Sequence, residues 1–407
     1  MEKPKYLKIS LYPFQSNSRD ARELETAEKA GFTDIALLTF TGEKGQAMAE
    51  NPHWNHTLIP RRPLGDAPLA RQLGKLLTSF LFVFKARSFH AKVLSGHDLL
   101  GLLIAYLATI GRRKDTLLIY DAHEYELGRS TGKPRTPMKK KWIGRLEKFL
   151  IQKSALTICV NSSIARQMEE DYGMSFAHVV VRNIPVARPI DRDLLEKNRR
   201  LFREKLGLGP KDPLLVYHGN LTQGRGIEPS IRLLAENKNA GLLILGNGPQ
   251  SYRDQLRGEA EKLGVQERIL FHPAVPGEVL LSYVGACDIA MILIRQKPKS
   301  YYFALPNKLF ESIHASLPII CSDSPELSAL VDGYGLGVCV SPEDGEAIKK
   351  AMDLLWEPDY YNKAKSRMKK AREDLTWEKE EEKLFQAMKD LRDFLERGSR
   401  EETGRGF

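Results

Sequence analysis

The hydrophobic pattern alternates between two kinds of segment along most of the chain. Short apolar runs bounded by polar or glycine-containing loops are typical of buried strands, and longer segments repeat their apolar residues at helical spacing. In the first half, strands are predicted at 6–11, 34–39, 92–95, 116–120, 156–160 and 178–181. In the second half, they are predicted at 214–217, 242–245, 268–271, 289–294, 318–321 and 337–340. Strands alternating with helices predict parallel sheets that are covered on both faces.

A charged, proline-containing stretch over residues 183–212 separates the two repeats of this pattern. The chain has 407 residues, which is more than one hydrophobic core ordinarily holds. We therefore predict two α/β domains with their boundary in this stretch. A long charged helix near the end, over residues 377–395, is expected to leave the second domain and pack elsewhere.

Composition places the chain in a broad class. Its hydrophobic content of 42% and charged content of 28% are typical of a soluble globular protein. The first residues lack the apolar core of a secretory signal, and the longest apolar run, 99–110, is shorter than the roughly 20 residues that cross a bilayer. The widely spaced cysteines have no metal-site spacing, and we expect buried free thiols in a reducing compartment. They are Cys159, Cys287, Cys321 and Cys339.

The net charge of +10 is concentrated in one segment. Between Arg129 and Lys153, nine basic residues accompany a single acid, Glu147. Apolar residues such as Trp142 and Phe149 interleave with these charges at helical spacing, which predicts an amphipathic helix on an anionic membrane surface. The alternative is an ordinary domain helix with a solvated basic face. Nucleic acid is not expected as a partner, because no binding motif or aromatic platform is present.

Residues 300–318 combine several groups that suit a phosphorylated ligand. Pro306 is expected at the first helical position, with no capping side chain before it, so the first amides are available to an anion. Asn307, Lys308 and Glu311 fall on one face of this helix. The basic and amide groups suit phosphate, and the carboxylate suits ribose hydroxyls. The alternative is a surface Lys308–Glu311 pair on an ordinary helix.

Other candidate residues follow predicted strands, where open parallel sheets bind their ligands. The loop 218–226 contains Arg225 and three glycines, which suit close approach to a diphosphate; the alternative is a glycine-rich connection with a solvated arginine. The loop 246–249 is also glycine-rich, although the dinucleotide fingerprint fails at Ser251.

In the first half, His123 follows a predicted strand and is expected to hydrogen-bond a sugar hydroxyl or a phosphate, unless it is a structural histidine. The Gly96-His97-Asp98 sequence is a similar but weaker case. A nucleophile elbow of the Gly-x-Ser-x-Gly type and histidine or aspartate clusters with metal-site spacing are both absent from the sequence.

Together these segments resemble glycosyltransferase family 4, a family of retaining enzymes with the GT-B fold. The likeness runs along nearly the whole chain and is strongest between Leu214 and Leu355, in YHGNLTQGRGIE, LLILGNGP, RILFHPAV and LPNKLFESIHASLPIICSD. In the first half, YDAHEYE and SALTICVNSSIARQMEEDYG look like family segments. The resemblance implies two Rossmann-like domains facing a cleft, an N-terminal acceptor domain over 1–205 and a donor domain over 206–375. The helix 376–397, in which LTWEKEEEKLF resembles the closing helix of the family, would cross back to the first domain.

The resemblance also implies roles for single residues. The phosphate-binding arginine and lysine of the family fall on Asn220 and Arg225. The first cation is therefore absent, and the second is an arginine in place of a lysine. The family's Glu-x7-Glu motif falls on Phe303 and Glu311, which keeps the carboxylate that binds ribose and loses the one that contacts the donor sugar. Catalytic roles are implied for His123, Arg225 and Lys308. Donor binding is implied for Gly219, Asn220, Gly224, Gly246, Gly248, Asn307 and Glu311.

The implied activity is retaining transfer of a sugar from a nucleotide-diphosphate sugar, with a UDP-sugar favoured. The acceptor would be a lipid-linked species or a glycan in surface polysaccharide or glycolipid assembly, reached from the cytoplasmic face of the membrane. Members of the family act without a bound metal or other cofactor. Two alternatives stay open: a non-hydrolysing sugar-nucleotide 2-epimerase on the same fold, and a non-catalytic GT-B scaffold at the membrane. The donor base, sugar, acceptor and oligomeric state are not determined by the sequence.

Overall fold

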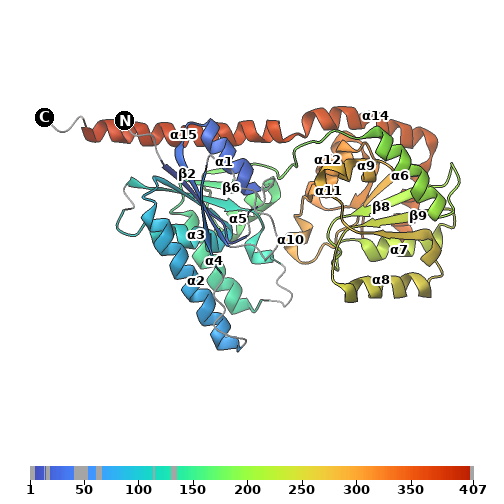
Figure 1. Cartoon of the computed structure of the whole chain (residues 1–407), viewed down its shortest axis with the longest axis horizontal. Helices are drawn as coiled ribbons and strands as arrows, with labels where there is room; N and C mark the ends of the chain where they lie inside the picture. The colour runs from blue at the N-terminus through green and yellow to red at the C-terminus, as the bar shows by residue number, and fades with distance from the viewer. Residues whose placement is uncertain are drawn as a thin grey trace. The chain divides into compact units, whose positions relative to one another are not determined.

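The structure is a computed structural model of the chain, and it describes residues 5–12, 14, 19–40, 54–60, 67–112, 115–129 and 135–403. Lys133, one of the basic residues counted above, lies outside these ranges. The chain forms two compact units, Met1–Arg182 with Glu380–Phe407, and Asn183–Lys379 (Figure 1). The expected α/β class with two parallel-sheet units is confirmed.

The division between the units falls at Arg182, earlier than the residue 205 expected from the sequence. The reason is α6 (Arg192–Lys205), which packs against α9 (Gly277–Val284) of the second unit. Phe202 of α6 is buried in the core of that unit. The closing helix α15 (Trp377–Thr403) belongs to the first unit from Glu380 onward.

The first unit contains a seven-stranded parallel sheet with strand order β3-β2-β1-β4-β5-β6-β7. Its strands are β1 (Lys5–Ile9), β2 (Thr33–Phe40), β3 (Asn55–Ile59), β4 (Val93–His97), β5 (Leu117–Ala122), β6 (Leu156–Cys159) and β7 (His178–Val180). The strand order reverses between β1 and β4. In open parallel sheets, ligands bind beyond the carboxyl ends of the strands at such a point, so His97, the last residue of β4, lies at this position.

Helices cover the sheet of the first unit. They are α1 (Arg19–Lys29), α2 (Pro68–Ser88), α3 (Asp98–Ala108), α4 (Pro137–Ile151), α5 (Ser162–Tyr172) and α15. Helix α3 packs on β4 and β5, and it contacts both α2 and α4. Helix α15 is bound to α1 through Lys29 and Glu381, whose charged atoms lie 2.7 Å apart. Arg392 of α15 also donates a hydrogen bond of 2.6 Å to the carbonyl of Ala30.

The second unit contains a six-stranded parallel sheet with strand order β10-β9-β8-β11-β12-β13. Its strands are β8 (Leu214–His218), β9 (Gly241–Leu245), β10 (Ile269–His272), β11 (Ile289–Ile292), β12 (Ile319–Ser322) and β13 (Gly337–Val340). This order is that of dinucleotide-binding folds, and it reverses between β8 and β11. The loops after these two strands, 219–226 and 293–306, therefore meet at the carboxyl edge of the sheet.

Two apolar clusters cover the two faces of this second sheet. Leu214 and Val216 of β8 face one cluster, and Leu215 and Tyr217 face the other. Because both faces are buried, the strands read as continuous apolar runs. The helices are α6, α7 (Ile227–Glu236), α8 (Gln250–Lys262), α9, α10 (Lys299–Tyr302), α11 (Asn307–His314), α12 (Pro325–Tyr334), α13 (Gly345–Trp356) and α14 (Pro358–Asp374).

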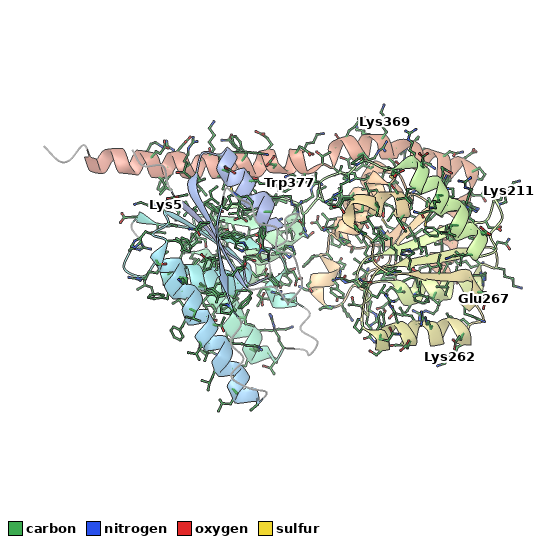
Figure 2. All side chains as sticks on the ribbon, viewed as in Figure 1. Lys5, Lys211, Lys262, Glu267, Lys369 and Trp377 are labelled. Carbon is green, nitrogen blue, oxygen red and sulfur yellow. The ribbon has the colours of Figure 1, made fainter. Side chains whose placement is uncertain are left out.

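Charged side chains lie on the outside of the second unit. Lys211, Lys262 and Lys369, labelled in Figure 2, are exposed and project from its surface. Trp377, also labelled there, is buried at the start of α15. Among the described helices, none is both long enough and apolar enough to cross a membrane.

Candidate functional site

The helix α11 opens the candidate site of the second unit. It begins at Asn307, and Pro306 is its N-cap residue, one position earlier in the helix numbering than the sequence predicted. Proline offers no side-chain acceptor, so the first amides of α11 are uncapped by this residue. The uncapped amides and the positive end of the helix dipole favour an anion at this point.

Lys308, in the first turn of α11, is buried with only 7% of its surface exposed. Its Nζ atom lies 3.8 Å from the centre of the Tyr217 ring and has no hydrogen-bond partner among the residues that the structure describes. Burial, together with the charge of Arg225, lowers the pKa of Lys308 to about 7, while Glu311 acts in the opposite direction. Lys308 is therefore not part of a surface ion pair, and its amine is poised to bind an anion.

Glu311 lies one turn further along α11 and pairs with the last residue of β8. Its Oε2 atom is 3.1 Å from Nε2 of His218, and His218 is buried. The carboxylate itself is half-buried, so one of its oxygens is fixed by the histidine. This arrangement orients a hydrogen-bond acceptor beside the loop that follows β8.

The backbone of the loop after β8 lies directly against Lys308. Gly219 has a φ of +118°, and a Cβ atom at this position would lie 3.7 Å from Cε of Lys308. Gly224 has a φ of +78°, and a Cβ there would come within 3.3 Å of the Tyr301 ring. Both glycines adopt backbone conformations that L-residues rarely take, which keeps this loop close to the lysine.

Arg225 is held over an aromatic ring. Its guanidinium carbon lies 4.8 Å from the centre of the Tyr301 ring, a cation–π contact that fixes the side chain. Asn220, at the other position where a cation was expected from the family, is exposed. Its carbonyl accepts a 2.7 Å hydrogen bond from the hydroxyl of Tyr217. The loop thus supplies one arginine and one amide to the site.

Gly246 and Gly248 allow the loop after β9 to pack against the loop after β8. A Cβ atom on Gly246 would lie 1.9 Å from the carbonyl oxygen of Gly219, and one on Gly248 would lie 2.4 Å from that of Leu221. The amide of Leu221 donates a 2.8 Å hydrogen bond to the carbonyl of Asn247. A side chain at either position would therefore collide with the loop after β8.

Asn307 and Phe303 differ in their exposure. Asn307 is exposed, and its Oδ1 atom accepts a hydrogen bond of 3.2 Å from Asn183. Phe303, at the position of the first glutamate of the family motif, is 8% exposed and packs against the ring of Tyr302 at 5.4 Å. It follows the short helix α10. This position therefore presents a buried aromatic ring in place of a carboxylate.

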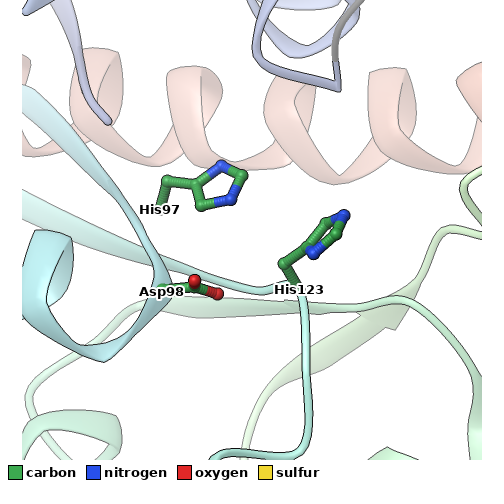
Figure 3. A group of neighbouring side chains, drawn as sticks. All are labelled: His97, Asp98 and His123. Carbon is green, nitrogen blue, oxygen red and sulfur yellow. The ribbon is translucent and has the colours of Figure 1, made fainter. Parts of the chain in front are cut away.

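His123 lies in the first unit, beyond the end of β5, next to His97 (Figure 3). The two imidazole rings are stacked with their centres 5.3 Å apart. Burial, with the positive charges of His97 and Arg19, lowers the pKa of His123 to about 4. His123 is therefore neutral at physiological pH, with one ring nitrogen able to donate and one able to accept a hydrogen bond.

His97 is bound to a buried network of charged groups below it. Its Nδ1 atom lies 2.8 Å from Oδ1 of Asp20. Burial lowers the pKa of His97, but the carboxylates of Asp20 and Asp121 outweigh it and raise the pKa to about 8. Lys8 is fully buried in the same network and donates hydrogen bonds to Asp121 at 2.9 Å and to Glu23. Each buried carboxylate thus has a cationic partner, as a buried ion pair requires.

His97, Asp98 and His123 come close enough together to suggest a cation site, since their ligand atoms lie within 4.8 Å of one another. This group could not be predicted from sequence spacing, because it joins the ends of two strands. One oxygen of the Asp98 carboxylate, Oδ2, already accepts hydrogen bonds from Tyr12 at 2.9 Å and Arg129 at 3.0 Å.

Sequence reasoning missed three residues of the candidate site in the second unit. Tyr217 and Tyr301 form aromatic contacts with the two cations, and His218 pairs with Glu311. Tyr217 is the last residue of a predicted strand, His218 is the first residue of the predicted loop 218–226, and Tyr301 lies within the 300–318 stretch. The aromatic residue directly before the glycine-rich loop 218–226 was the feature of the sequence that could have indicated Tyr217 as a site residue.

The arrangement of the second unit is a nucleotide-binding fold with a cationic, glycine-rich edge at its strand reversal. Residues 198–374, which include every site residue described above in the second unit, match the family model "Glycosyl transferases group 1". Sucrose-phosphate synthase from Thermosynechococcus elongatus has a similar structure, with a TM-score of 0.74, 17% identity and coverage of 96% of this chain and 99% of that one. The Anabaena protein HepE in complex with UDP is similar with a TM-score of 0.70, 15% identity and coverage of 96% and 99%. The fold is therefore of the GT-B type.

Curated relatives with glycosyltransferase names match the chain at low identity. An uncharacterized glycosyltransferase of Methanocaldococcus jannaschii is 25% identical over 239 residues, which are 58% of this chain and 59% of that protein. A GDP-mannose-dependent phosphatidylinositol monomannoside mannosyltransferase of Mycolicibacterium smegmatis is 26% identical over 203 residues, 48% of this chain and 52% of that protein. The chain thus matches little more than half the length of these relatives. The family-model match over residues 198–374 and these relatives support the resemblance to glycosyltransferase family 4 drawn from the sequence.

Proposed function

We propose that this protein is a retaining glycosyltransferase that takes its sugar from a nucleotide-diphosphate sugar. The observation that carries the proposal is the buried amine of Lys308, which has no hydrogen-bond partner in the described part of the chain. Such a group is costly to bury alone, and an incoming diphosphate would supply the missing acceptors. Arg225 and the first amides of α11 would bind the same anion.

The residues of the donor unit would act on the leaving group. The bond between the anomeric carbon and the diphosphate oxygen breaks, and the acceptor oxygen bonds to that carbon on the same face. The acceptor proton passes to the departing diphosphate, so no protein nucleophile is required. Lys308 and Arg225 would stabilise the charge that develops on the diphosphate, because both are positioned before the reaction begins.

Two further residues have proposed positioning roles. Glu311, oriented by His218, would accept hydrogen bonds from the ribose hydroxyls. His123, neutral at physiological pH, would hydrogen-bond a sugar hydroxyl. The reaction would use no metal or other cofactor. The buried Phe303 would make an apolar contact where the family has a carboxylate.

UDP is the donor nucleotide that we favour, and GDP is the first alternative. HepE from Anabaena was crystallised with UDP and with UDP-glucose, whereas the mycobacterial relative is named for GDP-mannose. That relative is also named for a phosphatidylinositol monomannoside acceptor. Together with the basic helix α4, this supports a lipid-linked acceptor in glycolipid or surface polysaccharide assembly, reached at the cytoplasmic face of a membrane.

A donor panel tests the proposal. The full chain is mixed with UDP-, GDP-, ADP- and dTDP-sugars, and binding is measured by calorimetry while donor consumption is followed by chromatography. Arg225→Ala should weaken binding of the true donor. The control is Arg232→Ala, because Arg232 is exposed on α7 and pairs only with Glu259 among the contacts described. The proposal is wrong if no donor binds or is consumed, or if both variants behave alike.

The same panel separates the alternatives. Conversion of the donor to its sugar epimer without an acceptor would identify a 2-epimerase. Tight nucleotide binding with no turnover on lipid or glycan acceptors would identify a non-catalytic scaffold. The exposed Asn220 and the buried Phe303, which stand where the family has an arginine and a glutamate, support this alternative. Transfer that preserves the anomeric configuration of the donor would establish a retaining enzyme.

A further inference from the structure

Helix α2 of the first unit exposes a row of large apolar side chains. Phe80 is 71% exposed, Phe84 is 70% exposed and Leu69 is 68% exposed. The full row consists of Leu69, Leu73, Leu76, Leu77, Phe80 and Phe84. Single exposed apolar residues need no explanation, but a continuous row on one helix indicates an interaction surface.

The row lies on the side of α2 that faces away from the protein. Its members are separated by four, three, one, three and four residues, which places them on one helical face. The buried positions Gly74, Thr78, Phe82 and Ala86 recur every four residues and fall on the opposite face. Helix α2 is therefore apolar on both sides, and only one of these sides is used by the fold. Figure 1 shows α2 extending past the edge of the sheet.

The neighbouring helices α3 and α4 also expose apolar side chains. Helix α3 contacts α2 on one side and α4 on the other. On α3, Leu100 and Leu107 are exposed, and on α4, Met138 and Trp142 are 73% and 64% exposed. We call the outward face of α2, α3 and α4 the helical face.

The charges of the helical face all have one sign. The three helices contain only two acidic residues, Asp98 and Glu147, and both are buried. Glu147 is bound to the hydroxyls of Tyr120 and Tyr172 and does not reach the surface. Every exposed charged side chain described on these helices is basic. On α2, Arg87 lies on the side of the apolar row, whereas Lys75 and Lys85 lie on other sides of the helix. On α4, the exposed basic residues are Lys139, Lys140, Lys141 and Arg145. The surface is thus both apolar and cationic.

We propose that the helical face docks on an anionic lipid bilayer, with α2 lying in the plane of the interface. The leucine and phenylalanine row would enter the boundary between headgroups and acyl chains, and the lysines of α4 would contact lipid phosphates. The basic helix was expected from the sequence to meet a membrane, but the apolar contact comes from α2. The proposal does not depend on the transferase reaction, although it would bring the protein to a lipid-linked acceptor.

Two other occupants fit this face less well. A nucleic acid would neutralise the lysines but would leave the exposed leucines and phenylalanines without apolar partners. A second copy of the chain would cover the apolar row but would bring two sets of lysines together with no facing carboxylates. A bilayer of anionic lipids offers both an apolar phase and negative charges in one layer.

Vesicle binding tests the apolar part of the proposal. The full chain is sedimented with vesicles of phosphatidylcholine alone or mixed with phosphatidylglycerol. The double variant Phe80→Ser/Phe84→Ser should reduce partitioning into the mixed vesicles about tenfold or more. The control is Phe394→Ser on α15, because Phe394 is 60% exposed in the same unit but lies outside the helical face.

The charged part is tested with lysines. Lys139→Gln/Lys140→Gln/Lys141→Gln should weaken binding to the mixed vesicles and flatten its dependence on salt. The matched control is Lys363→Gln/Lys369→Gln/Lys370→Gln on α14, which removes three exposed lysines from the second unit. Wild-type binding to phosphatidylcholine alone should be weaker than to the mixed vesicles.

Trp142 reports insertion directly, because Trp54 and Trp377 are buried and Trp356 is half-buried. Its fluorescence should shift to shorter wavelength on vesicles and be quenched by brominated lipid.

The proposal is overturned if mixed vesicles are not bound at low salt, or if the phenylalanine variants bind like Phe394→Ser. It is equally overturned if Phe80→Ser/Phe84→Ser instead converts a dimer into a monomer, or if duplex DNA or RNA displaces the vesicles. UDP binding by the same variants should be unchanged, so failure here is distinct from failure of the proposed transferase activity.

Discussion

The Nζ atom of Lys308 lies 3.8 Å above the centre of the Tyr217 ring. The ring face attracts the ammonium group electrostatically. It does not provide an oxygen or nitrogen acceptor for the three N–H donors of that group. The lysine comes from the start of α11 and the tyrosine from the end of β8, the two elements on either side of the strand reversal. The contact therefore holds a partly desolvated amine at the point where this fold binds its ligands.

Lys308→Met should weaken ligand binding without lowering the stability of the ligand-free protein. A charge-assisted hydrogen bond contributes about 1.5–3 kcal/mol, so the affinity for UDP should fall roughly 10- to 100-fold. The melting temperature of the ligand-free protein should stay equal or rise, because the variant removes a buried, unpaired amine. Calorimetry and thermal unfolding measure the two effects. Lys262→Met, at an exposed position of α8, is the control, and equal UDP affinity in the two variants would contradict the prediction.

Affinity for UDP should fall as pH rises above about 7. Burial lowers the pKa of Lys308 to about 7 from its ordinary value of 10.5, so the free folded protein loses this proton above pH 7. A bound diphosphate favours the ammonium form, so binding at about pH 8 should take up a proton. Calorimetry in buffers of different ionisation enthalpy measures this uptake. Lys308→Arg, which stays charged, should show no such uptake, and proton release by the wild type would contradict the assignment.

The same lowered pKa affects stability in a defined direction. Between about pH 7 and 10.5 the unfolded chain carries the Lys308 proton and the folded chain does not. The unfolded state therefore binds more protons, and the contribution of Lys308 to the free energy of unfolding should increase with pH across this window. Subtracting the pH profile of Lys308→Met from that of the wild type isolates this contribution. A difference that decreases with pH would contradict it.

Glu311→Gln should affect nucleotide and pyrophosphate binding unequally. The substitution keeps the shape of the side chain but removes the charge that pairs with His218 at 3.1 Å. If the carboxylate holds ribose, UDP should bind about tenfold or more weakly and inorganic pyrophosphate should be unaffected. Lys308→Met should weaken both ligands. Competition calorimetry compares the two variants, and equal losses for both ligands in Glu311→Gln would place the carboxylate on the phosphates.

Much of the architecture could be predicted from the sequence, because the local pattern determines it. Every expected strand is present, since each is a short apolar run between loops. Strand β3 was missed because its sequence, NHTLI, is polar and the strand is half-exposed at the sheet edge. Helix α14 was missed because its buried face is narrow and formed by Ala364, Met368 and Ala371 in an otherwise charged segment.

The residue types of the site could be predicted from the sequence, but the contacts between them could not. Lys308, Glu311 and Arg225 could be assigned because they follow predicted strands. The burial of Lys308 depends on Tyr217, which lies in a distant part of the sequence, and no local pattern indicates that contact. The exposed face of α2 was likewise hidden, because a leucine- and phenylalanine-rich helix has the composition of a buried one. Which apolar face is covered depends on tertiary packing.

Gly246→Ala should destabilise the second unit severely. A Cβ atom at this position would lie 1.9 Å from the carbonyl oxygen of Gly219, so the two loops would have to separate. A loss of about 3 kcal/mol or more in the free energy of unfolding is expected, as for other changes that disrupt buried backbone packing. Gly258→Ala in α8 is the control, because nothing lies within 4 Å of its Cβ position, and it should be neutral or stabilising by up to about 1 kcal/mol. Urea denaturation compares the two, and equal stability would show that the loops can separate without cost.

The two neighbouring histidines of the first unit should titrate on opposite sides of the ordinary histidine pKa. His97 should titrate near pH 8, because the carboxylates of Asp20 and Asp121 outweigh burial, and His123 should stay neutral down to about pH 4. For His97, the folded state holds its proton more tightly, so its stabilising contribution is full below about pH 6.5 and is lost as pH rises through 8. For His123, the unfolded state holds the proton more tightly, so stability falls as pH drops below about 6.5.

Imidazole NMR titration of the full chain measures both values, and His97→Gln provides the decisive comparison. The imidazolium of His97 is one of the charges that lowers the pKa of His123, so its removal should move the pKa of His123 upward toward the ordinary value. Burial would still keep it below that value. His178→Gln, at an exposed position, should leave both titrations unchanged. If His123 titrates identically in all three proteins, the two stacked rings are electrostatically independent, and the neutral state of His123 must be attributed to burial and Arg19 alone.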